Sequence, residues 1–141
     1  MPSITGISHV DLSVTNLQAS LAWYCDLLGA IELMGGRNDA HDLDVCYLLE
    51  PTSGVIIGLE QHDANEGSPF DEKRVGLDHL AFNVASREEL DAWLARLEEL
   101  GISNSGIHES EPWDVLVFRD PDNIQLELFL LNADPATLLP S

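Results

Sequence analysis

Two stretches of the chain alternate apolar and polar residues in the same way, and each stretch carries one histidine. The first is GISHVDLSV at residues 6–14, and the second is GLDHLAFNV at residues 76–84. Alternation with a period of two is typical of a β-strand with one apolar and one polar face. His9 and His79 fall at the same place in the two strands. The pattern therefore predicts a duplicated unit, with one histidine on the polar face of each first strand.

A helical pattern follows each of these strands, because apolar residues then recur three or four positions apart. Thr15 or Asn16 can cap the first helix, and Ser86 begins an S-x-x-E capping box for the second helix. Gly29 and Gly101 follow the two helices, where a glycine in the left-handed conformation commonly ends a helix. Both units are therefore predicted to continue with one amphipathic helix.

Three strand-like segments follow each helix, so that each unit has the order β-α-β-β-β. They are residues 30–34, 44–49 and 54–59 in the first unit, and residues 105–109, 115–119 and 124–130 in the second. The tight turn RDPDNIQ contains Asn123, which tolerates a left-handed conformation. We expect one domain over residues 1–141, with a first module at about 4–61, a linker at about 62–74 and a second module at about 75–131.

The composition is that of a globular protein with a strongly acidic surface. The chain has 25 acidic and 6 basic residues, for a net charge of −19, and 45% of its residues are hydrophobic. Such a charge repels phosphate backbones, so we expect no nucleic-acid partner. No apolar run is long enough to span a membrane, and we expect no membrane partner. Cys25 and Cys46 belong to no recognisable motif, which favours reduced thiols and a cytoplasmic location.

Three residues on predicted polar strand faces form a candidate metal-binding set. Glu127 lies between two leucines of the last strand, on its polar face, and His9 and His79 lie on the first strands of the two units. A single histidine in such a place is usually hydrogen-bonded or solvated, and a pair can be a relic of duplication. Two imidazoles and a carboxylate are, however, a common ligand set for a divalent transition metal, with positions left for substrate or water.

The paired histidine strands, the two β-α-β-β-β units and the ending FRDPDNIQLELF resemble the vicinal oxygen chelate superfamily. This group includes glyoxalase I, extradiol dioxygenases, fosfomycin-resistance transferases and bleomycin-resistance proteins, and the resemblance covers residues from about 4 to about 130. It implies an α+β, glyoxalase-like fold in which two tandem βαβββ modules form a cupped eight-stranded mixed sheet. It also implies that His9, His79 and Glu127 bind one divalent metal ion, which is Fe, Mn, Ni, Zn or Co.

The resemblance leaves open which residue is the fourth ligand of the implied site. Glyoxalase I carries a second glutamate on the last strand of its first unit, where this chain reads GVIIGLEQH. Alignment of that strand with NIQLELF places Gly58 opposite Glu127 and leaves the position empty. A shift in register brings Glu60, two residues further on the same face, into the site. We therefore retain Glu60 beside Glu127 as a candidate metal ligand and catalytic carboxylate.

The resemblance implies a metal-dependent enzyme that acts on a small molecule with adjacent oxygens. Lyase or isomerase chemistry is favoured over dioxygenase chemistry, because the second unit lacks the tyrosine of the familiar extradiol enzymes. The alternative is a non-catalytic, drug-binding protein of the bleomycin-resistance type, although such proteins keep no metal ligands. Family members commonly form homodimers, so we also expect a homodimer.

Overall fold

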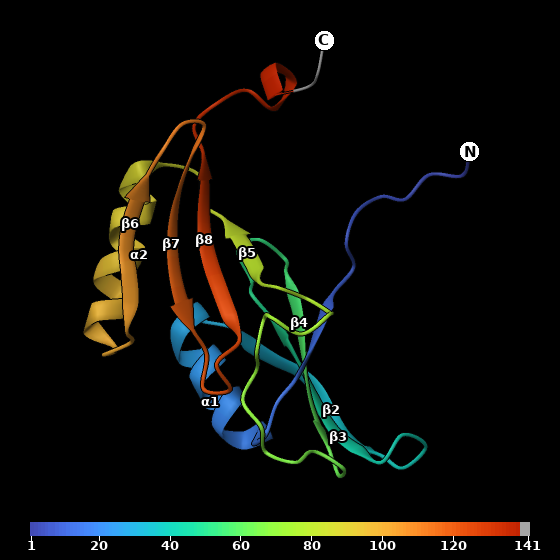
Figure 1. Ribbon diagram of the computed structural model, residues 1–141. Coiled ribbons are helices and arrows are strands. Elements are labelled where there is room, and N and C mark those ends of the chain that lie inside the picture. Colours follow the sequence, from blue (N-terminus) through green and yellow to red (C-terminus); the bar gives the residue numbers. More distant parts are fainter. Residues whose placement is uncertain (139–141) are drawn as a thin grey trace. The chain divides into compact units, whose positions relative to one another are not determined.

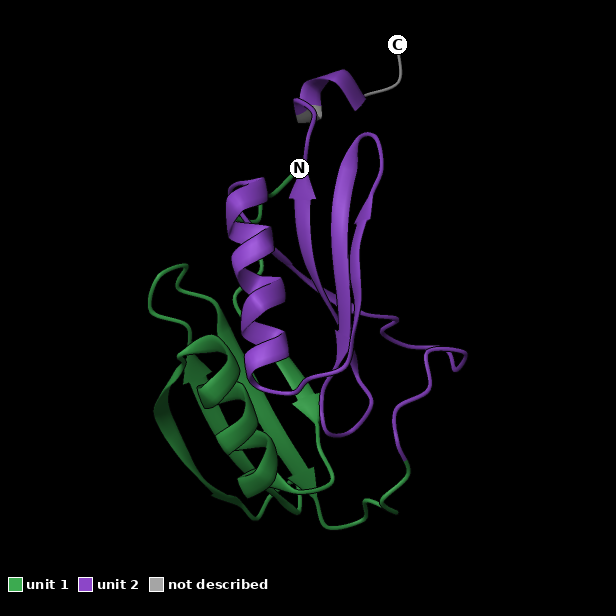
Figure 2. Ribbon diagram, turned by 90° about the vertical axis from the view of Figure 1, so that its left-hand side faces the viewer, with its two compact units in different colours: residues 1–68 green, residues 69–141 purple. Residues whose placement is uncertain are grey.

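The chain folds into two compact units of the same construction. The structure is a computed structural model that describes residues 1–138. The first unit comprises residues 1–68 and the second residues 69–141 (Figure 2). The boundary falls inside the stretch 62–74 that the sequence predicts as a linker. Each unit has the predicted order β-α-β-β-β, so the duplication extends to the whole architecture (Figure 1).

Unit 1 is a four-stranded mixed sheet with one helix packed against it. Its elements are β1 (Val10–Ser13), α1 (Leu17–Leu28), β2 (Ile31–Asn38), β3 (Leu43–Leu49) and β4 (Ile56–His62). The strand order is β1-β4-β3-β2, with β1 parallel to β4 and the other neighbours antiparallel. The first strand of the unit therefore lies beside the last.

Unit 2 repeats this topology. Its elements are β5 (Leu80–Asn83), α2 (Arg87–Glu99), β6 (Asn104–Glu109), β7 (Trp113–Arg119) and β8 (Gln125–Leu131). The strand order is β5-β8-β7-β6, and β5 is parallel to β8. A short 3₁₀ helix, Pro135–Leu138, follows the last strand. The predicted α+β fold of two βαβββ modules is confirmed, and within residues 1–138 the eight strands form two mixed sheets of four.

The predicted helix ends are formed as the sequence indicates. Asn16 caps α1, and its side chain accepts a hydrogen bond from the backbone N–H of Ala19 at 3.0 Å. The Ser86 hydroxyl accepts the equivalent bond from Glu89 at 3.2 Å. Gly29 ends α1 with a φ of 62°, in the left-handed region that glycine adopts without a steric cost.

Several strand boundaries differ from the sequence prediction, and backbone pairing explains them. For example, β2 extends to Asn38 because it pairs with β3 as far as Leu43. The first strands are shorter than predicted, so that His9 and His79 lie directly before β1 and β5. Pairing with the last strand begins only at Val10 in unit 1 and at Leu80 in unit 2. In contrast, β4 extends to His62, because its ladder with β3 continues that far. The connection between the units therefore begins after His62.

The alternation along the strands separates a core face from an open face in each sheet. In each unit the helix covers one face of the sheet (Figure 2). Leu12, Leu59 and Leu126 are at most 3% exposed on these helix-covered faces. Their neighbours along the strands point to the opposite faces. The open faces therefore carry the polar side chains of the candidate site. Among the described residues, neither helix is long and apolar enough to span a membrane.

Replacement of a core leucine next to the candidate site should destabilise the protein. Leu126→Ala removes a fully buried side chain opposite Leu80. We expect the free energy of unfolding to fall by about 2–5 kcal/mol, since the lost contacts leave a cavity. Urea denaturation followed by circular dichroism measures this change. Val75→Ala, at a fully exposed position of the same unit, should change it by less than about 0.5 kcal/mol. Equal effects of the two substitutions would contradict the assignment of the core.

Candidate metal centre

Unit 2 brings a histidine and a carboxylate together on its open face. His79 lies directly before β5, and Glu127 lies on the parallel neighbour β8, opposite Ala81. The His79 Nε2 atom is 3.7 Å from Glu127 Oε2. The side chain of His79 is 40% exposed, whereas that of Glu127 is 14% exposed. The parallel pairing of β5 with β8 thus produces the His–Glu pair that the sequence predicts for this unit.

Both members of this pair have further partners that orient them. His79 Nδ1 is 2.7 Å from the carboxylate oxygen Oδ1 of Asp78. A carboxylate accepts hydrogen bonds, so this contact places the proton on Nδ1 and leaves the Nε2 lone pair available in the neutral ring. Gln125 Nε2 donates to Glu127 Oε1 at 3.2 Å, which leaves Oε2 toward His79. Such outer partners are typical of metal-binding histidines and carboxylates.

Arg119 connects this pair to the segment that precedes β5. Its two terminal nitrogens each donate to a carboxylate oxygen of Glu72 at 3.1 Å, and one also donates to Gln125 Oε1 at 2.8 Å. The Arg119 guanidinium lowers the pKa of Glu72 to about 2, mainly through these hydrogen bonds. The charge of Arg119 is therefore already paired with a carboxylate on this face of the sheet.

Unit 1 contains a second histidine–carboxylate pair with the same separation of 3.7 Å, although both of its members belong to one strand segment. His9 lies directly before β1, and its Nε2 atom is 3.7 Å from Asp11 Oδ2. The His9 Nδ1 atom is 3.1 Å from the Ser8 hydroxyl. In unit 2, the Nδ1 atom of His79 likewise contacts the preceding residue, Asp78. The Tyr47 ring stands edge-on to the imidazole, with 6.1 Å between the ring centroids. In both units, the preceding residue holds Nδ1 while Nε2 faces a carboxylate.

The strand register shows where Gly58 and Glu60 lie. Gly58 is paired with Asp11, as Glu127 is paired with Ala81 in unit 2, so Gly58 is equivalent in register to Glu127. Glu60 is two residue pairs further along the sheet, opposite Ser13. Its carboxylate is 3.5 Å from His62 Nε2. Glu60 shares the open face with His9, and its role as a fourth ligand stays a prediction.

The structure adds residues that the sequence alone did not identify. Ser8 and Asp78 immediately precede the two histidines and contact their Nδ1 atoms. A polar residue directly before each histidine was the sequence signal that could have identified them. Asp11 and Gln125 share the open faces with His9 and Glu127, but a strand face carries many such polar residues. Among residues 1–138, His, Cys, Asp and Glu side chains form no group of three that could hold a metal ion. Each unit thus presents a pair of candidate ligands.

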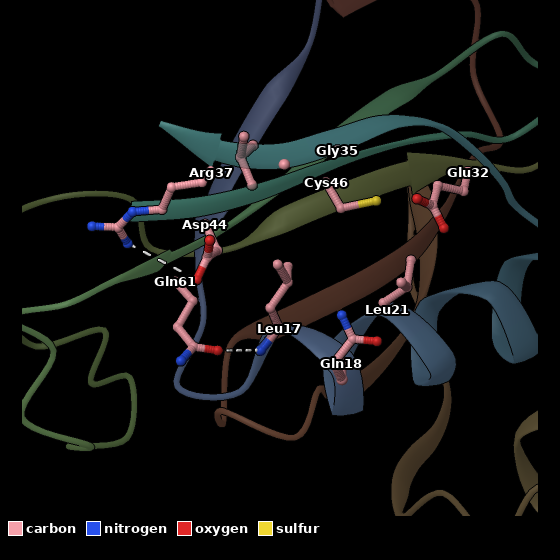
Figure 3. Close-up of a pocket in the computed structure, with 11 residues that line it drawn as sticks. Leu17, Gln18, Leu21, Glu32, Gly35, Arg37, Asp44, Cys46 and Gln61 are labelled. Carbon is pink, nitrogen blue, oxygen red and sulfur yellow. Dashed lines mark hydrogen bonds and ion pairs between the residues drawn. The ribbon is translucent and has the colours of Figure 1, made fainter. Parts of the chain in front are cut away.

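A hollow on the other face of the unit 1 sheet is separate from these residues. It has a volume of about 420 Å³ and lies between α1 and strands β2 to β4 (Figure 3). Gln61 and Arg37 are among the residues that line it. The Gln61 side chain is held there by a hydrogen bond that the backbone N–H of Leu17 donates to its Oε1 atom at 2.7 Å. Glu60 and His62 flank Gln61 in β4 and therefore point to the opposite face. We do not assign the candidate site to this hollow.

The Arg119–Glu72 contact should make stability depend on pH in the acidic range. The folded-state pKa of Glu72 is about 2 and its ordinary value is 4.5. The stabilising contribution is therefore complete above about pH 4.5 and is lost as the pH falls toward about 2, where the folded chain also takes up the proton. Glu72→Gln should flatten the decrease in unfolding free energy over this range, as measured by urea denaturation at several pH values.

The matched control for this measurement is Glu98→Gln, which removes an exposed carboxyl group of α2. This variant should keep the pH dependence of the wild type. An equally steep decrease in the Glu72→Gln variant would show that Arg119 does not hold the Glu72 carboxylate in solution.

Solved structures of other proteins share this fold. A crystal structure of a glyoxylase/bleomycin resistance protein/dioxygenase domain from Frankia sp. EAN1pec is 40% identical, with a TM-score of 0.84, and the match covers 92% of this chain and 93% of that one. The fosfomycin resistance protein FosX from Listeria monocytogenes, solved with Mn(II) and 1S,2S-dihydroxypropylphosphonic acid, is 22% identical, with a TM-score of 0.68, over 98% of this chain and 100% of that one. At that identity, FosX shows the fold alone.

Relatives with assigned names have different activities. The metallothiol transferase FosB of Staphylococcus epidermidis is 27% identical over 89% of this chain and 81% of its own length. The putative ring-cleaving dioxygenase MhqA of Bacillus subtilis is 28% identical over 89% of this chain, which spans 40% of the length of that protein. The family model of the Glyoxalase/Bleomycin resistance protein/Dioxygenase superfamily matches residues 6–128. The chain belongs to the glyoxalase/bleomycin resistance protein/dioxygenase superfamily.

Proposed function

We propose that the protein is a metal-dependent enzyme that acts on a small molecule with adjacent oxygens. His9, His79 and Glu127 would bind one divalent metal ion, with contributions from both units. The observation that carries this proposal is the repeated geometry at the two histidines. Each has Nδ1 held by the preceding residue and Nε2 at 3.7 Å from a carboxylate oxygen.

The residues present fit a divalent transition metal. Imidazole nitrogens and carboxylate oxygens are ligands for Fe, Mn, Ni, Zn and Co alike. Two ligands at about 2.1 Å from a metal ion, at an angle of about 90–110°, are about 3.0–3.4 Å apart. The 3.7 Å separation of His79 Nε2 and Glu127 Oε2 reaches this range after a small side-chain movement. The relative FosB, named a metallothiol transferase, supports the metal dependence.

The carboxylates of the site would handle the substrate proton. A divalent metal ion, when bound, polarises the adjacent oxygens of a substrate. Glu127 is 14% exposed and is fixed at Oε1 by Gln125, so it is suited to orient a ligand and to accept a proton at Oε2. Glu60, with a side chain that is 24% exposed beside His62, is the second candidate for proton transfer.

The arrangement favours lyase or isomerase chemistry over the activities of the named relatives. A phosphonate ligand, such as the 1S,2S-dihydroxypropylphosphonic acid in the FosX structure, needs a cation that is free to bind it. Arg119, which lies on the open face of unit 2, already binds Glu72 with both terminal nitrogens. The tyrosine nearest to a site histidine is Tyr47 in unit 1, whereas ring-cleaving enzymes resembling this fold use one in the second unit. A homodimer in the cytoplasm, with a small-molecule substrate, completes the proposal.

Metal content tests the proposed function directly. Untagged protein is incubated with Fe(II), Mn, Ni, Zn or Co, desalted and measured by inductively coupled plasma mass spectrometry. We expect about one equivalent of metal per chain for the wild type. His79→Ala should retain almost none, because it removes one of the two imidazoles.

The control variant is His108→Ala, which removes an exposed histidine of β6 in the same unit. It should retain as much metal as the wild type. Wild-type protein that retains no metal under any of these conditions would contradict the proposal and would favour a small-molecule binding protein. Equal loss in the two histidine variants would also contradict it.

A further inference from the structure

We propose that Asp11 supplies the carboxylate ligand of unit 1, in the role that Glu127 has in unit 2. The inference rests on the proposed metal site and identifies a ligand for it. The two candidates in this unit are Asp11 on β1 and Glu60 on β4, and both lie on the open face of the sheet. The register, the space above Gly58 and the position of His9 all favour Asp11.

The strand register places the two carboxylates at the same level of the two sheets. In unit 2, Glu127 on the last strand is paired with Ala81 on the first. In unit 1, Asp11 on the first strand is paired with Gly58 on the last. One carboxylate and one small residue thus occupy this pair in each unit, but on exchanged strands. Unit 1 therefore also has a carboxylate at this level, although the residue of its last strand there is glycine.

The space above Gly58 is taken by the Asp11 side chain. A Cβ atom added at Gly58 would lie 2.0 Å from Asp11 Oδ1 and 2.9 Å from Tyr47 Cε1. The carboxylate of Asp11 therefore reaches across to β4, where a side chain of residue 58 would begin.

The position of His9 distinguishes Asp11 from Glu60. Asp11 Oδ2 is 3.7 Å from His9 Nε2, the distance that separates the corresponding atoms of His79 and Glu127. Glu60 is two residue pairs further along the strands, about 7 Å away in that direction. In unit 2 the equivalent position is Phe129, which is paired with Asn83 and cannot bind a metal ion. Asp11 therefore forms with His9 the same pair as Glu127 forms with His79.

Cobalt binding by matched carboxylate variants tests this assignment. Co²⁺ is titrated into wild type, Asp11→Asn, Glu60→Gln and His79→Ala, with dissociation constants from calorimetry and ligand changes from the visible absorption of Co²⁺. Asp11→Asn should weaken Co²⁺ binding by at least about tenfold, since even outer partners of metal ligands contribute this much. Glu60→Gln should change the affinity by less than about threefold, because Glu60 lies two residues, or about 7 Å, along the strands from the level of Asp11.

A double variant tests whether the carboxylate can be moved from the first strand of unit 1 to its last strand. Gly58→Glu alone should collide with Asp11 and bind Co²⁺ poorly. Asp11→Ala combined with Gly58→Glu reproduces the arrangement of Ala81 and Glu127, and it should restore binding to within about tenfold of the wild type. Far-UV circular dichroism and urea midpoints show that each variant is folded.

The outcomes separate the two proposals. If wild type binds Co²⁺, His79→Ala does not, and Asp11→Asn binds like the wild type, the metal site stands and the assignment of Asp11 is overturned. A large loss in Glu60→Gln with none in Asp11→Asn overturns it in favour of Glu60. Absence of Co²⁺ binding by the wild type overturns the metal site and the role of Asp11 together.

Discussion

The parallel pairing of the first and last strand of each unit is the constraint on which the candidate centre depends. A parallel neighbour cannot be reached by a tight hairpin, so the chain passes through a helix and two further strands before it returns. The pairing then sets the level of every residue on β1 against β4 and on β5 against β8. His9 and His79, which lie directly before the first strands, are thereby placed near carboxylates that lie two residues further along.

The division of each sheet into two faces leaves the open face available for polar chemistry. The helix-covered faces are filled by leucines, such as Leu59 and Leu126, which lose their contact with water completely. The open faces need not contribute to that core, so they tolerate histidines and carboxylates. The residues of both pairs retain some exposure, from 14% for Glu127 to 47% for His9. This partial exposure leaves them accessible to a metal ion and a substrate.

The charges of the protein favour cationic and neutral ligands over anionic ones. With a net charge of −19, the surface attracts metal ions and repels anionic molecules. Several arginines are already bound by carboxylates: Arg37 by Asp63, Arg87 by Asp91 and Glu109, and Arg119 by Glu72. These pairs reduce the positive charge available for an anionic substrate. The acidic composition and the pairing of these arginines therefore both favour a cationic or neutral ligand over an anionic one.

The sequence by itself determined the duplicated βαβββ architecture, the helix caps and the face on which each candidate ligand lies. These features depend on local periodicity and on short-range hydrogen bonds, as at Asn16 and Ser86, which a linear pattern reveals. Only the tertiary structure decided the register of β1 against β4, and with it the equivalence of Gly58 to Glu127. Register depends on backbone pairing between segments far apart in the chain, and a shift of two residues leaves the apolar pattern unchanged. The Asp11 carboxylate lies above Gly58 because that pairing puts the two residues side by side and glycine has no side chain to fill the space.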